Sequence, residues 1–451
     1  MKISVIGLGK LGTPLAVVLA SKGHDVVGVD VNPDFVRLLA SGKSPVEEPG
    51  IQKLIDDNRG RISATADLEA AVLKTEVTFV IVPTPSDHQG GFSNKYVLSA
   101  VTAIGQALRK KRDYHVVNVT STVMPGSTGG EIRRALETAS GREVGATCGL
   151  CYNPEFVALG SVMRDMLYPD MILVGESDAR AGGVLEEIYK TVCEKNPPVK
   201  RMNWMNAEIT KISVNTYVTT RISYANMLSD ICERLPGADV DVVTAALGAD
   251  SRIGKKYLKG ALGYGGPCFP RDNVAFSHLA RTLGARPDLA EATDRLNRYQ
   301  IERLAAAASR LLEGGSKVGI LGLSYKPETA VIEESQGVAL AARLSESRRE
   351  VYVHDPMALS AAMAVLGDKV VPMRSAEECV KAVDVLVITT AWPQYAEIPA
   401  QVFARPQARL QILDCWRILS RERLAGVADL HFLGAAAPEP AGRQIRAVQS
   451  S

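Results

Sequence analysis

Residues 2–12 of this 451-residue chain read Lys2-Ile3-Ser4-Val5-Ile6-Gly7-Leu8-Gly9-Lys10-Leu11-Gly12. The apolar run over 2–6 predicts a buried strand, and the run over 13–21 that follows the glycines predicts a helix. A second apolar strand, over 25–29, ends at Asp30. Strand, GxGxxG, helix, strand and acid are the parts of a dinucleotide-binding site, in the order that such a site requires. We therefore expect an α/β fold whose first unit binds a dinucleotide.

The glycines and the acid of this motif also indicate which dinucleotide is bound. Without Cβ atoms, the glycines let backbone N–H groups and the helix N-terminus approach a pyrophosphate. Asp30 follows Gly7 by about twenty residues, the spacing at which an acid accepts hydrogen bonds from the ribose hydroxyls. Because a carboxylate repels a 2′-phosphate, we predict that the cofactor is NAD and not NADP.

Further apolar strands, over 77–82, 116–119 and 149–152, end in polar residues. In open parallel sheets the ligand lies beyond the carboxyl ends of the strands, so these residues are expected to face the cofactor. Ordinary turn and cap chemistry would also place polar residues there. Glu155, after the third of these strands, is expected at the same rim. The predicted cofactor contacts are Gly7, Gly9, Lys10, Leu11, Gly12, Asp30, Pro83, Thr84, Ser121 and Thr122.

Composition excludes several classes of protein. With 46% hydrophobic residues and a mean hydropathy of +0.03, the chain is an ordinary globular one, and its length predicts two or three domains. The 52 Lys and Arg against 50 Asp and Glu indicate neither a nucleic-acid nor a membrane partner. No apolar run could span a bilayer, and the strand at the N-terminus leaves no room for a signal peptide. We therefore expect a cytoplasmic location.

Seven cysteines, an odd number without a secretion signal, indicate reduced thiols and not a disulfide framework. Cys148 and Cys151 form a CxxC pair, but they have no second pair and lie in an apolar run. We interpret them as core residues and predict no metal site.

The rest of the chain predicts two Rossmann-like, doubly wound parallel-sheet domains joined by a long central helix. A strand over 171–174 and a helix over 178–193 complete the first domain. The long helix covers 206–235, with Asn206 as its cap and Glu208 in its first turn. Such a helix usually links domains or crosses a subunit interface. The strands of the second α/β unit are expected at 317–322, 351–355, 385–390 and 411–414.

The second unit looks like a degraded copy of the first. Gly319 and Gly322 remain, but no full GxGxxG follows, so we expect a nucleotide-like site that does not hold NAD. The chain after Phe432 is rich in Ala, Pro and Gly and is predicted to be disordered. The predicted domains are 1–202, which binds NAD, 203–313, which is the central helical region, 314–434, which is the second Rossmann-like domain, and the tail 435–451.

The stretch 260–273 contains four glycines and two prolines around Cys268, so turns must shape it. A thiol on such a loop, with Arg271 and Asp272 within one turn of it, suits a nucleophile. A buried, inert cysteine beside a glycine turn fits the same residues. The sequence pattern alone leaves both interpretations open.

The sequence pattern also leaves two interpretations for each of two other groups of polar residues. Lys211 and Asn215, at i and i+4 on the long helix, either share a functional face or are solvated surface positions. Arg252, Lys255 and Lys256 stand beside a glycine, which suits phosphate binding and also a solvated basic turn.

Taken together, the motifs resemble the UDP-glucose/GDP-mannose dehydrogenase family over essentially the whole chain. Any one of them is a common string, but six in register are highly specific. The six are Gly7 to Gly12 with Asp30, Ser121-Thr122-Val123-Met124-Pro125-Gly126, Asn153-Pro154-Glu155-Phe156, Lys211 with Asn215, the segment 263–272 around Cys268, and Leu321-Gly322-Leu323-Ser324-Tyr325-Lys326-Pro327.

The resemblance implies an NAD-dependent, four-electron oxidation of the C6 hydroxyl of a nucleotide-activated hexose, UDP-glucose to UDP-glucuronate in the first instance. It makes Cys268 the nucleophile that forms a thiohemiacetal and then a thioester. It gives Asp272 the task of ordering a water that acts as base, with help from Lys211. Lys211 and Asn215 then stabilise the oxyanion of the adduct.

The same resemblance implies which residues take part in thioester hydrolysis, how the dimer forms and where the substrate binds. Glu155 and Thr122 lie at the water that hydrolyses the thioester. A homodimer forms on the central helix, Arg252 reaches across it to the neighbouring substrate, and the C-terminal domain binds the nucleotide sugar. The implied substrate-binding residues are Glu155, Phe156, Val157, Lys211, Asn215, Arg252, Tyr257, Leu258, Tyr264, Gly265, Phe269, Tyr325, Lys326 and Arg417.

The chain departs from the usual pattern of the family at several positions. Leu159 stands where many members carry a second Glu, and Glu333 stands where an Arg would meet the cofactor. Pro267 and Arg271 replace the common Ser and Lys. The substrate therefore stays open among UDP-glucose, dTDP-glucose, GDP-mannose and a UDP-N-acetylhexosamine, although Phe156 favours the glucose and mannose branches.

Two other classes of protein compete with this interpretation. A single-step NAD dehydrogenase of a small hydroxy acid also pairs a Rossmann domain with a long helix and a catalytic Lys, but it needs no thiol. A non-catalytic NAD-binding protein would have no reason to hold Lys211, Asn215, Cys268 and Asp272 together.

Overall fold

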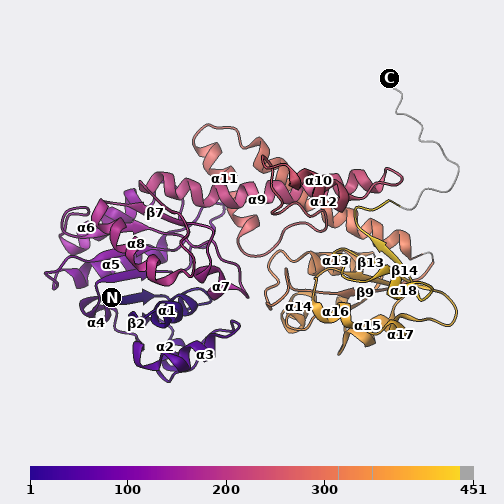
Figure 1. Ribbon diagram of the computed structural model, residues 1–451, viewed down its shortest axis with the longest axis horizontal. Coiled ribbons are helices and arrows are strands. Elements are labelled where there is room, and N and C mark those ends of the chain that lie inside the picture. The colour runs from indigo at the N-terminus through magenta and orange to yellow at the C-terminus, as the bar shows by residue number, and fades with distance from the viewer. Residues whose placement is uncertain (313, 348, 437–451) are drawn as a thin grey trace. The chain divides into compact units, whose positions relative to one another are not determined.

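The computed structural model describes residues 1–312, 314–347 and 349–436 (Figure 1). The chain separates into two compact units. The first comprises Met1–Val214 and His278–Gly284, and the second comprises Asn215–Ser277 and the chain from Ala285 onward. This division cuts through the predicted central region, and the predicted domain boundaries stay predictions.

An eight-stranded sheet forms the centre of the first unit, in the order β3-β2-β1-β4-β5-β6-β7-β8. Strands β1 to β6 are parallel, as predicted, whereas β7 is antiparallel to β6, with Cys151 opposite Glu176. The edge strands β3 and β8 were not predicted, because they are short and mostly half-exposed. The strands are β1 Lys2–Ile6, β2 Asp25–Val29, β3 Ile62–Thr65, β4 Val77–Val80, β5 Val116–Val119, β6 Gly149–Tyr152, β7 Ile172–Glu176 and β8 Val199–Met202.

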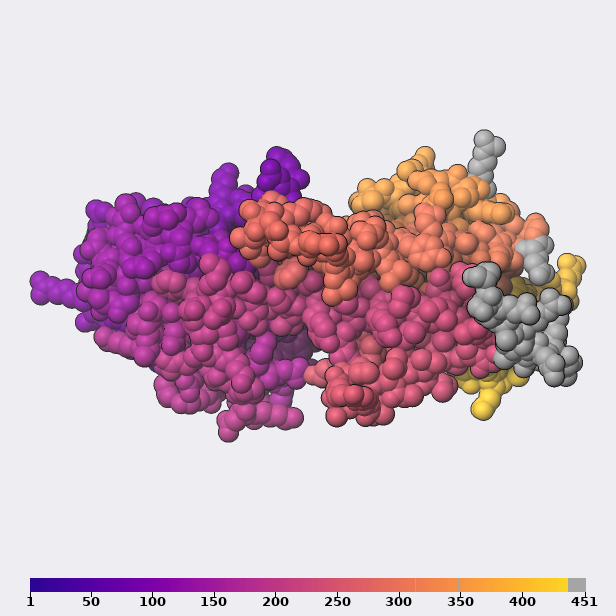
Figure 2. Space-filling model, turned by 90° about the horizontal axis from the view of Figure 1, so that it is seen from above, coloured from indigo at the N-terminus to yellow at the C-terminus, as the bar shows by residue number. Residues whose placement is uncertain are grey.

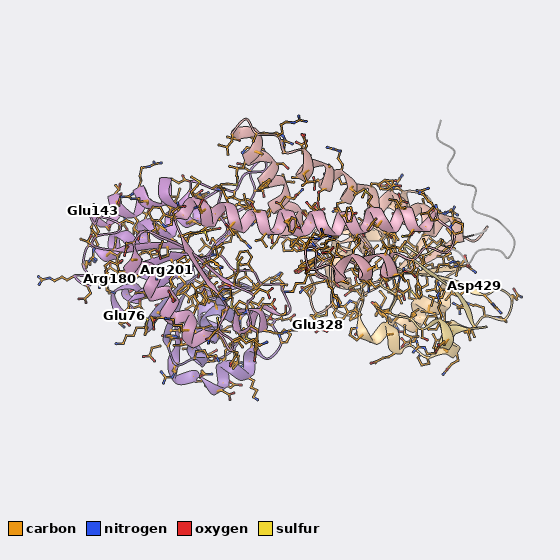
Figure 3. The ribbon with its side chains drawn as sticks, turned by 45° about the horizontal axis from the view of Figure 1, so that its top comes forward. Glu76, Glu143, Arg180, Arg201, Glu328 and Asp429 are labelled. Atoms are coloured by element: carbon orange, nitrogen blue, oxygen red, sulfur yellow. The ribbon has the colours of Figure 1, made fainter. Side chains whose placement is uncertain are left out.

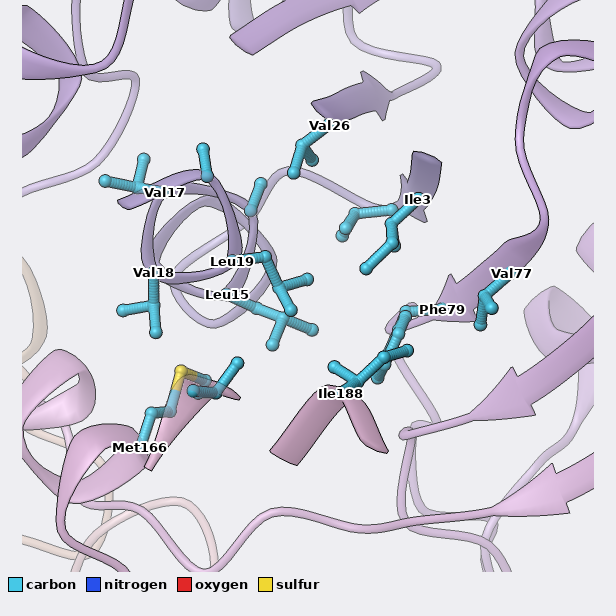
Figure 4. Close-up of a cluster of buried hydrophobic side chains, with 14 of the residues drawn as sticks. Ile3, Leu15, Val17, Val18, Leu19, Val26, Val77, Phe79, Met166 and Ile188 are labelled. Carbon is cyan, nitrogen blue, oxygen red and sulfur yellow. The ribbon is translucent and has the colours of Figure 1, made fainter. Parts of the chain in front are cut away.

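Helices cover this sheet, and the first of them is the best buried. From Gly12 to Ala20 every residue of α1 is buried, because it packs between the sheet and its neighbours. Figure 4 shows Leu15 and Leu19 of this helix beside Ile3, Phe79 and Ile188. The helices are α1 Gly12–Ser21, α2 Pro33–Ala40, α3 Ile51–Asp57, α4 Leu68–Lys74, α5 Lys95–Leu108, α6 Arg133–Ser140, α7 Val162–Leu167 and α8 Ala179–Val192.

The second sheet has six parallel strands in the order β11-β10-β9-β12-β13-β14. The four predicted strands are present, and β11 and β14 extend the sheet at its edges. The strands are β9 Lys317–Leu321, β10 Glu350–His354, β11 Val371–Pro372, β12 Val385–Ile388, β13 Leu410–Asp414 and β14 Ala428–Phe432. The helices are α13 Gln336–Glu346, α14 Leu359–Leu366, α15 Ala376–Ala382, α16 Pro393–Glu397, α17 Ala400–Phe403 and α18 Arg421–Leu424.

Four helices lie between the two sheets in the sequence: α9 Trp204–Glu233, α10 Val240–Ala249, α11 Phe269–Thr282 and α12 Asp288–Leu311. Figure 3 shows α9 as one uninterrupted helix. It begins two residues before the predicted start, and the predicted cap is wrong. The side-chain oxygen of Asn203 accepts a hydrogen bond from the Asn206 N–H (2.9 Å), so Asn203 caps the helix.

The predicted disorder of the C-terminal tail is wrong for its first residues. The Gly434 carbonyl accepts a hydrogen bond from the Val240 N–H (2.8 Å), and Ala435 forms an isolated bridge with Asp239. The Gly434 N–H in turn donates to the carboxylate of Glu233 (2.8 Å). These bonds fix residues 433–436 to the start of α10 and the end of α9. The rest of the predicted tail, 437–451, lies outside the described residues.

The second sheet repeats the glycine geometry of the first. Gly7 and Gly322 follow the first strand of each unit and both have positive φ, +101° and +111°. A Cβ atom added to Gly12 would lie 1.8 Å from the Gly7 carbonyl oxygen, and one added to Gly337 would lie 2.1 Å from that of Gly322. The close approach of helix to turn that defines a dinucleotide site is therefore present twice.

The acid is also repeated, but it is used differently. Asp30 accepts a hydrogen bond from the Leu8 N–H (2.6 Å), and Asp355 accepts one from the Leu323 N–H (2.7 Å). Asp355 is buried and accepts further bonds from Ser324, from the Trp392 indole and from the Met357 and Ala358 N–H groups. Because protein donors surround this carboxylate, it does not offer a ribose the site that Asp30 offers.

Candidate active site

In the turn after β1, Gly12 packs closely against the backbone, whereas Gly9 has free space beside it. Gly12 leaves no room for a Cβ atom, because the Gly7 carbonyl lies against it, whereas a Cβ atom on Gly9 would meet no atom within 4 Å. The first turn of α1 has no side-chain cap and no acidic residue, so its N–H groups can receive an anion. These residues fit the pyrophosphate of a dinucleotide.

Asp30 lies half-buried just after β2, where a ribose is expected. One carboxylate oxygen accepts the Leu8 N–H and the other accepts the Asn32 N–H (2.6 and 2.7 Å). These bonds hold the carboxylate in place, and a carboxylate has further lone pairs that can accept the hydroxyls of a ribose. Asp30 therefore fits the role that the sequence predicts for it.

We expect Asp30→Ala to weaken NAD binding and to narrow the preference for NAD over NADP, because it removes both the ribose acceptor and the negative charge that repels a 2′-phosphate. Titration of each cofactor against the protein's intrinsic fluorescence measures both effects. Asp34→Ala, an exposed acid on the neighbouring helix α2, serves as the control. Equal affinity of the unaltered protein for the two cofactors would overturn the assignment.

The polar residues after β4 and β5 hold these two rim segments together. The Ser121 hydroxyl donates to the Val82 carbonyl (2.7 Å) and accepts from the Val82 N–H (2.9 Å). The Thr84 hydroxyl donates to the Thr122 carbonyl (2.8 Å). Thr84, Ser121 and Thr122 therefore share one rim, as predicted from the carboxyl ends of their strands.

Glu208, which the sequence analysis places in the first turn of the long helix, connects α9 to the same rim. Glu208 is fully buried, and its two oxygens accept the N–H groups of Gly126 and Thr128 (2.6 and 2.7 Å). Burial raises the pKa of this carboxyl group, while these hydrogen bonds act in the opposite direction. Glu208 stands one turn before Lys211, so it ties the segment after Thr122 to the helix that carries Lys211.

Lys211 and Glu155 meet in the first unit. The buried Lys211 ammonium group donates to the Glu155 carbonyl (2.7 Å) and lies 4.6 Å from the centroid of the Phe156 ring. Glu155 is half-buried as a residue, but its carboxyl group turns inward to the Tyr189 hydroxyl (3.2 Å). Burial raises the pKa of Glu155 to about 7, although Tyr189 and the Lys211 charge lower it. A carboxyl group with this pKa can act as a base near neutral pH.

Asn215, Asp272 and Cys268 come together in the second unit. The Asn215 amide on α9 donates to the buried Asp272 carboxylate on α11 (2.6 Å). Cys268 directly precedes α11, and its carbonyl accepts the Asp272 N–H (2.8 Å). Its thiol is exposed, so the interpretation as a buried core cysteine does not hold. A helix N-terminus favours negative charge, and thiolate is the reactive form of cysteine.

Burial also decides the environment of two residue pairs that the sequence pattern singles out. Lys211 and Asn215 are both buried, so they are not solvated surface positions. Cys148 and Cys151 are buried as well, and burial raises the pKa of the Cys148 thiol to about 11 and that of Cys151 well above its usual range. The CxxC pair is therefore part of the core, as predicted.

The predicted substrate residues of the second unit have varied environments. Tyr257, with φ +61°, and Phe269 form an edge-to-face pair with ring centroids 6.4 Å apart. The Tyr264 hydroxyl donates to Asp294 (3.2 Å), and Leu258 is buried. Lys326 lies 6.0 Å from the centroid of the Tyr325 ring.

Two predicted substrate arginines pair with acids of the same chain. Arg252 is exposed and contacts Asp250 (2.6 Å). The Arg417 guanidinium contacts Asp239 (2.8 Å) and Asp241 (3.2 Å) and donates to the Leu433 carbonyl. The part of Arg417 in substrate binding stays a prediction, and in the structure it also holds the segment at Leu433.

Comparison with known proteins decides the family. Residues 1–193 match the NAD binding domain of the UDP-glucose/GDP-mannose dehydrogenase family, residues 205–299 match its central domain, and residues 319–421 match its UDP binding domain. The chain belongs to this family. UDP-glucose 6-dehydrogenase AglM of Haloferax volcanii is 36% identical over 93% of this chain and 98% of that protein.

Other members of the UDP-glucose/GDP-mannose dehydrogenase family are similar to the chain as well. GDP-mannose 6-dehydrogenase of Pseudomonas aeruginosa is 33% identical over 79% of this chain and 81% of that protein. The solved structure of a UDP-glucose dehydrogenase from Pyrobaculum islandicum superimposes with a TM-score of 0.85 at 36% identity, covering 96% of this chain and 98% of that one.

These findings confirm the family predicted from six motifs, the two-sheet α/β fold and NAD as the cofactor. The chain is an NAD-dependent dehydrogenase of a nucleotide sugar. The hydroxy-acid dehydrogenase and the non-catalytic binding protein are therefore no longer competing classes. In residues 1–312, 314–347 and 349–436 no helix is long and apolar enough to cross a membrane, and no group of His, Cys, Asp and Glu could hold a metal ion.

Proposed function

We propose that this protein oxidises the C6 hydroxyl of UDP-glucose to the carboxylate of UDP-glucuronate, through a thioester on Cys268. The observation that carries the proposal is the exposed Cys268 thiol at the N-terminus of α11, one turn before an Asp272 carboxylate held by Asn215. A single-step oxidation of an alcohol needs no such thiol. Bound NAD supplies the hydride acceptor in each of the two oxidation steps.

In the first oxidation the residues of this chain move the hydroxyl proton. Asp272 has one oxygen on the Asn215 amide and can order a water with the other, and this water accepts the proton as hydride leaves C6. Lys211 lowers the cost of the negative charge that develops on the oxygen. The product of this step is an aldehyde.

In the second oxidation Cys268 adds to the aldehyde carbon, and its proton goes to the aldehyde oxygen, which gives a thiohemiacetal. Loss of hydride and of the hydroxyl proton turns this adduct into a thioester. Glu155, with its pKa near 7, then takes a proton from the water that attacks the thioester, and Thr122 helps to place that water. The carbon–sulfur bond breaks, and the carboxylate and the thiol are released.

UDP-glucose is the proposed substrate because relatives that carry this name cover nearly all of the chain. Phe156 after Asn153-Pro154-Glu155 favours the glucose and mannose branches over the N-acetylhexosamine branch. A panel of UDP-glucose, dTDP-glucose, GDP-mannose and UDP-N-acetylhexosamines, followed by NADH absorbance, tests the choice. The highest kcat/KM is expected for UDP-glucose, with two NADH formed per sugar. A higher kcat/KM for GDP-mannose would move the protein to the other branch of the family.

We further infer that the protein is a homodimer formed on α9. Exposed apolar side chains recur along this helix at Tyr217, Tyr224, Met227 and Ile231. Tyr217, Tyr224 and Ile231 follow each other at seven-residue spacing, which places them on one side of the helix and suits pairing with a second copy of the same stripe. Figure 2 shows atoms of the residues between 204 and 311, magenta to salmon, at the surface of the molecule.

If each active site contains residues of both subunits, a mixture of inactive Arg252→Ala and inactive Cys268→Ser protein under subunit exchange is expected to regain activity. Half of the dimers in an equal mixture are mixed, and each of these regains one intact site of its two, so up to about a quarter of the turnover should return. Arg252 is the residue implied to cross the interface, and within one chain its exposed guanidinium contacts Asp250 (2.6 Å). NADH formation by the exchanged mixture measures the effect. No recovery, with mixed dimers shown by mass spectrometry, would mean that each site is built within one chain.

A further inference from the structure

The second sheet has a dinucleotide-like glycine geometry, but a long segment of chain lies where the first unit has a short turn. In the first unit Gly7 leads to Gly12 and α1 directly. In the second unit the segment 323–335, here called the strap, separates Gly322 from α13. A hydrogen bond from the Tyr325 N–H to the Val331 carbonyl (3.0 Å) closes the strap on itself.

The strap contains two residues whose backbone conformation is unfavourable for any residue with a Cβ atom. Glu328 has φ +63° and Glu334 has φ +51°, and Figure 3 labels Glu328. Such conformations persist only where the surrounding structure holds them, and they gather at functional sites. At Glu334 the surrounding structure is the loop that carries Cys268.

The glycines of the Cys268 loop lie directly against the end of the strap. The Gly266 N–H donates to the Glu333 carbonyl (2.9 Å). A Cβ atom on Gly265 would lie 2.3 Å from the Glu334 carbonyl oxygen. One on Gly263 would instead meet the side-chain oxygens of Asn297 and Gln336 (2.6 and 2.7 Å), which lie outside the strap. A residue other than glycine at position 265 would have to push the loop and the strap apart, because the atom that its Cβ meets belongs to the backbone.

The Tyr325 side chain of the strap also packs against the Cys268 loop. Its ring carbons would lie 2.6 to 3.1 Å from a Cβ atom on Gly266, whose φ of +84° also favours glycine. Burial raises the pKa of Tyr325, and the negative charges of Cys268 and Glu333 raise it further. The ring carbon that bears the Tyr325 hydroxyl would lie 3.1 Å from a Cβ atom on Gly266, and Gly266 stands two residues before Cys268.

We propose that the strap is the seat of the catalytic loop and that Tyr325 is a positioning residue, whose ring fixes Gly266 and so keeps the Cys268 thiol at the N-terminus of α11. This role deepens the proposed function, since it concerns the residue assigned as nucleophile. It acts before any substrate binds, so it is separate from the substrate contact that the family resemblance implies for Tyr325. Removal of the ring lets the loop move, and the thiol loses the helix N-terminus that favours thiolate.

Alkylation by iodoacetamide, without NAD or sugar, tests the proposal directly. Of the seven cysteines, all of which the structure describes, five are buried, Cys193 is half-buried and Cys268 is exposed, so peptide mapping can follow Cys268 by itself. Because thiolate is the reacting form, the pH dependence of the rate reports how strongly the site favours it. Tyr325→Ala is expected to move the midpoint of this profile to higher pH, and Tyr325→Phe, which keeps the ring, is expected to leave it in place.

Turnover gives a second readout of the same change. Tyr325→Ala is expected to lower kcat by about 10²-fold, the size of loss that a small displacement of a reacting group causes. If Tyr325→Ala changes both the alkylation profile and kcat, a substrate contact alone cannot explain the result, because no substrate is present during alkylation.

Two glycines provide a matched control for the loop side of the contact. Gly266 and Gly237 have nearly the same φ, +84° and +81°, but a Cβ atom on Gly237 would meet no atom within 4 Å. Gly266→Ala is expected to shift the alkylation profile as Tyr325→Ala does, and Gly237→Ala, which carries the same backbone strain, is expected to leave it unchanged. If Tyr325→Ala does not fold, this pair decides the question.

An unchanged profile in both Tyr325→Ala and Gly266→Ala would overturn the proposal. A shifted profile in these variants, combined with full turnover by Cys268→Ser, would support the positioning role of the strap and of Tyr325 and would reject the thioester mechanism. The two proposals can therefore fail separately.

Discussion

Cys268→Ser is expected to bind NAD and the nucleotide sugar and yet to lose at least about 10³-fold in kcat, because the second oxidation needs a covalent adduct that a serine hydroxyl forms poorly near neutral pH. The exposed thiol sits at the start of α11, where the helix N-terminus favours thiolate. A hydroxyl has a far higher pKa than a thiol, so the same position does not activate it. Only traces of carboxylate should form.

Rapid mixing of Cys268→Ser with substrate, with NADH counted per active site, shows which half of the reaction stalls. Intact mass of the quenched original protein shows whether sugar is attached, and the same peak should be missing from the variant. Cys193→Ser, at the half-buried cysteine, is the matched control and should behave as the original protein. Two NADH per sugar at the normal rate from Cys268→Ser would mean that the thioester is wrong and that the loop is structural only.

The parts of the fold that the sequence predicts well are those that local patterns determine. The first strand, turn and helix have a run of apolar residues, a glycine motif and a helical period, all within twenty-odd positions, and β1, α1 and β2 lie where this pattern places them. Strands β3 and β8 escape the same analysis because they are edge strands of four residues with little buried surface. Their pairing depends on the neighbouring strand, which no local pattern contains.

The active-site partners show the same limit more clearly. Tyr189 reaches Glu155 from the last turn of α8, and nothing in its own helix marks it. Glu208 looks like an ordinary first-turn acid, but its carboxylate binds two N–H groups some eighty positions earlier in the chain. Such contacts follow from how distant segments fold together. The sequence marks Cys268 and Lys211 as candidate residues, whereas it does not mark Tyr189 or the N–H groups that Glu208 binds.

The cap of α9 and the start of the C-terminal tail, residues 433–436, were mispredicted for a related reason. Asn206 is a good cap by residue type, but Asn203 lies three positions earlier and reaches the free N–H first. Residues 433–436 have a composition typical of disorder, yet hydrogen bonds to Val240 and Glu233 order them. Composition reports what a segment can bury by itself, and here a neighbouring helix supplies the partners.

Lys211→Ala is expected to slow both oxidations, by about 10²–10³-fold in kcat, because it removes the donor that stabilises negative oxygen in each of them. Lys211 is buried, and its ammonium group donates to the Glu155 carbonyl. Bulk water therefore does not readily take over its role as a donor in Lys211→Ala. Unlike Cys268→Ser, this variant should show no rapid first NADH. Rapid mixing of the two variants side by side measures the difference, and a full first phase in Lys211→Ala would remove Lys211 from the first step.

Lys211→Ala is also expected to move the pH dependence of thioester hydrolysis. Burial raises the pKa of Glu155 to about 7, and the Lys211 charge opposes this rise, so loss of the charge raises the pKa further. Glu155 acts as a base only when it is deprotonated, and the midpoint of the hydrolysis step in single-turnover experiments should therefore shift to higher pH. Lys190→Ala, at an exposed lysine next to Tyr189 on α8, should leave it in place. A midpoint that stays the same or falls in Lys211→Ala would mean that Glu155 does not control this step.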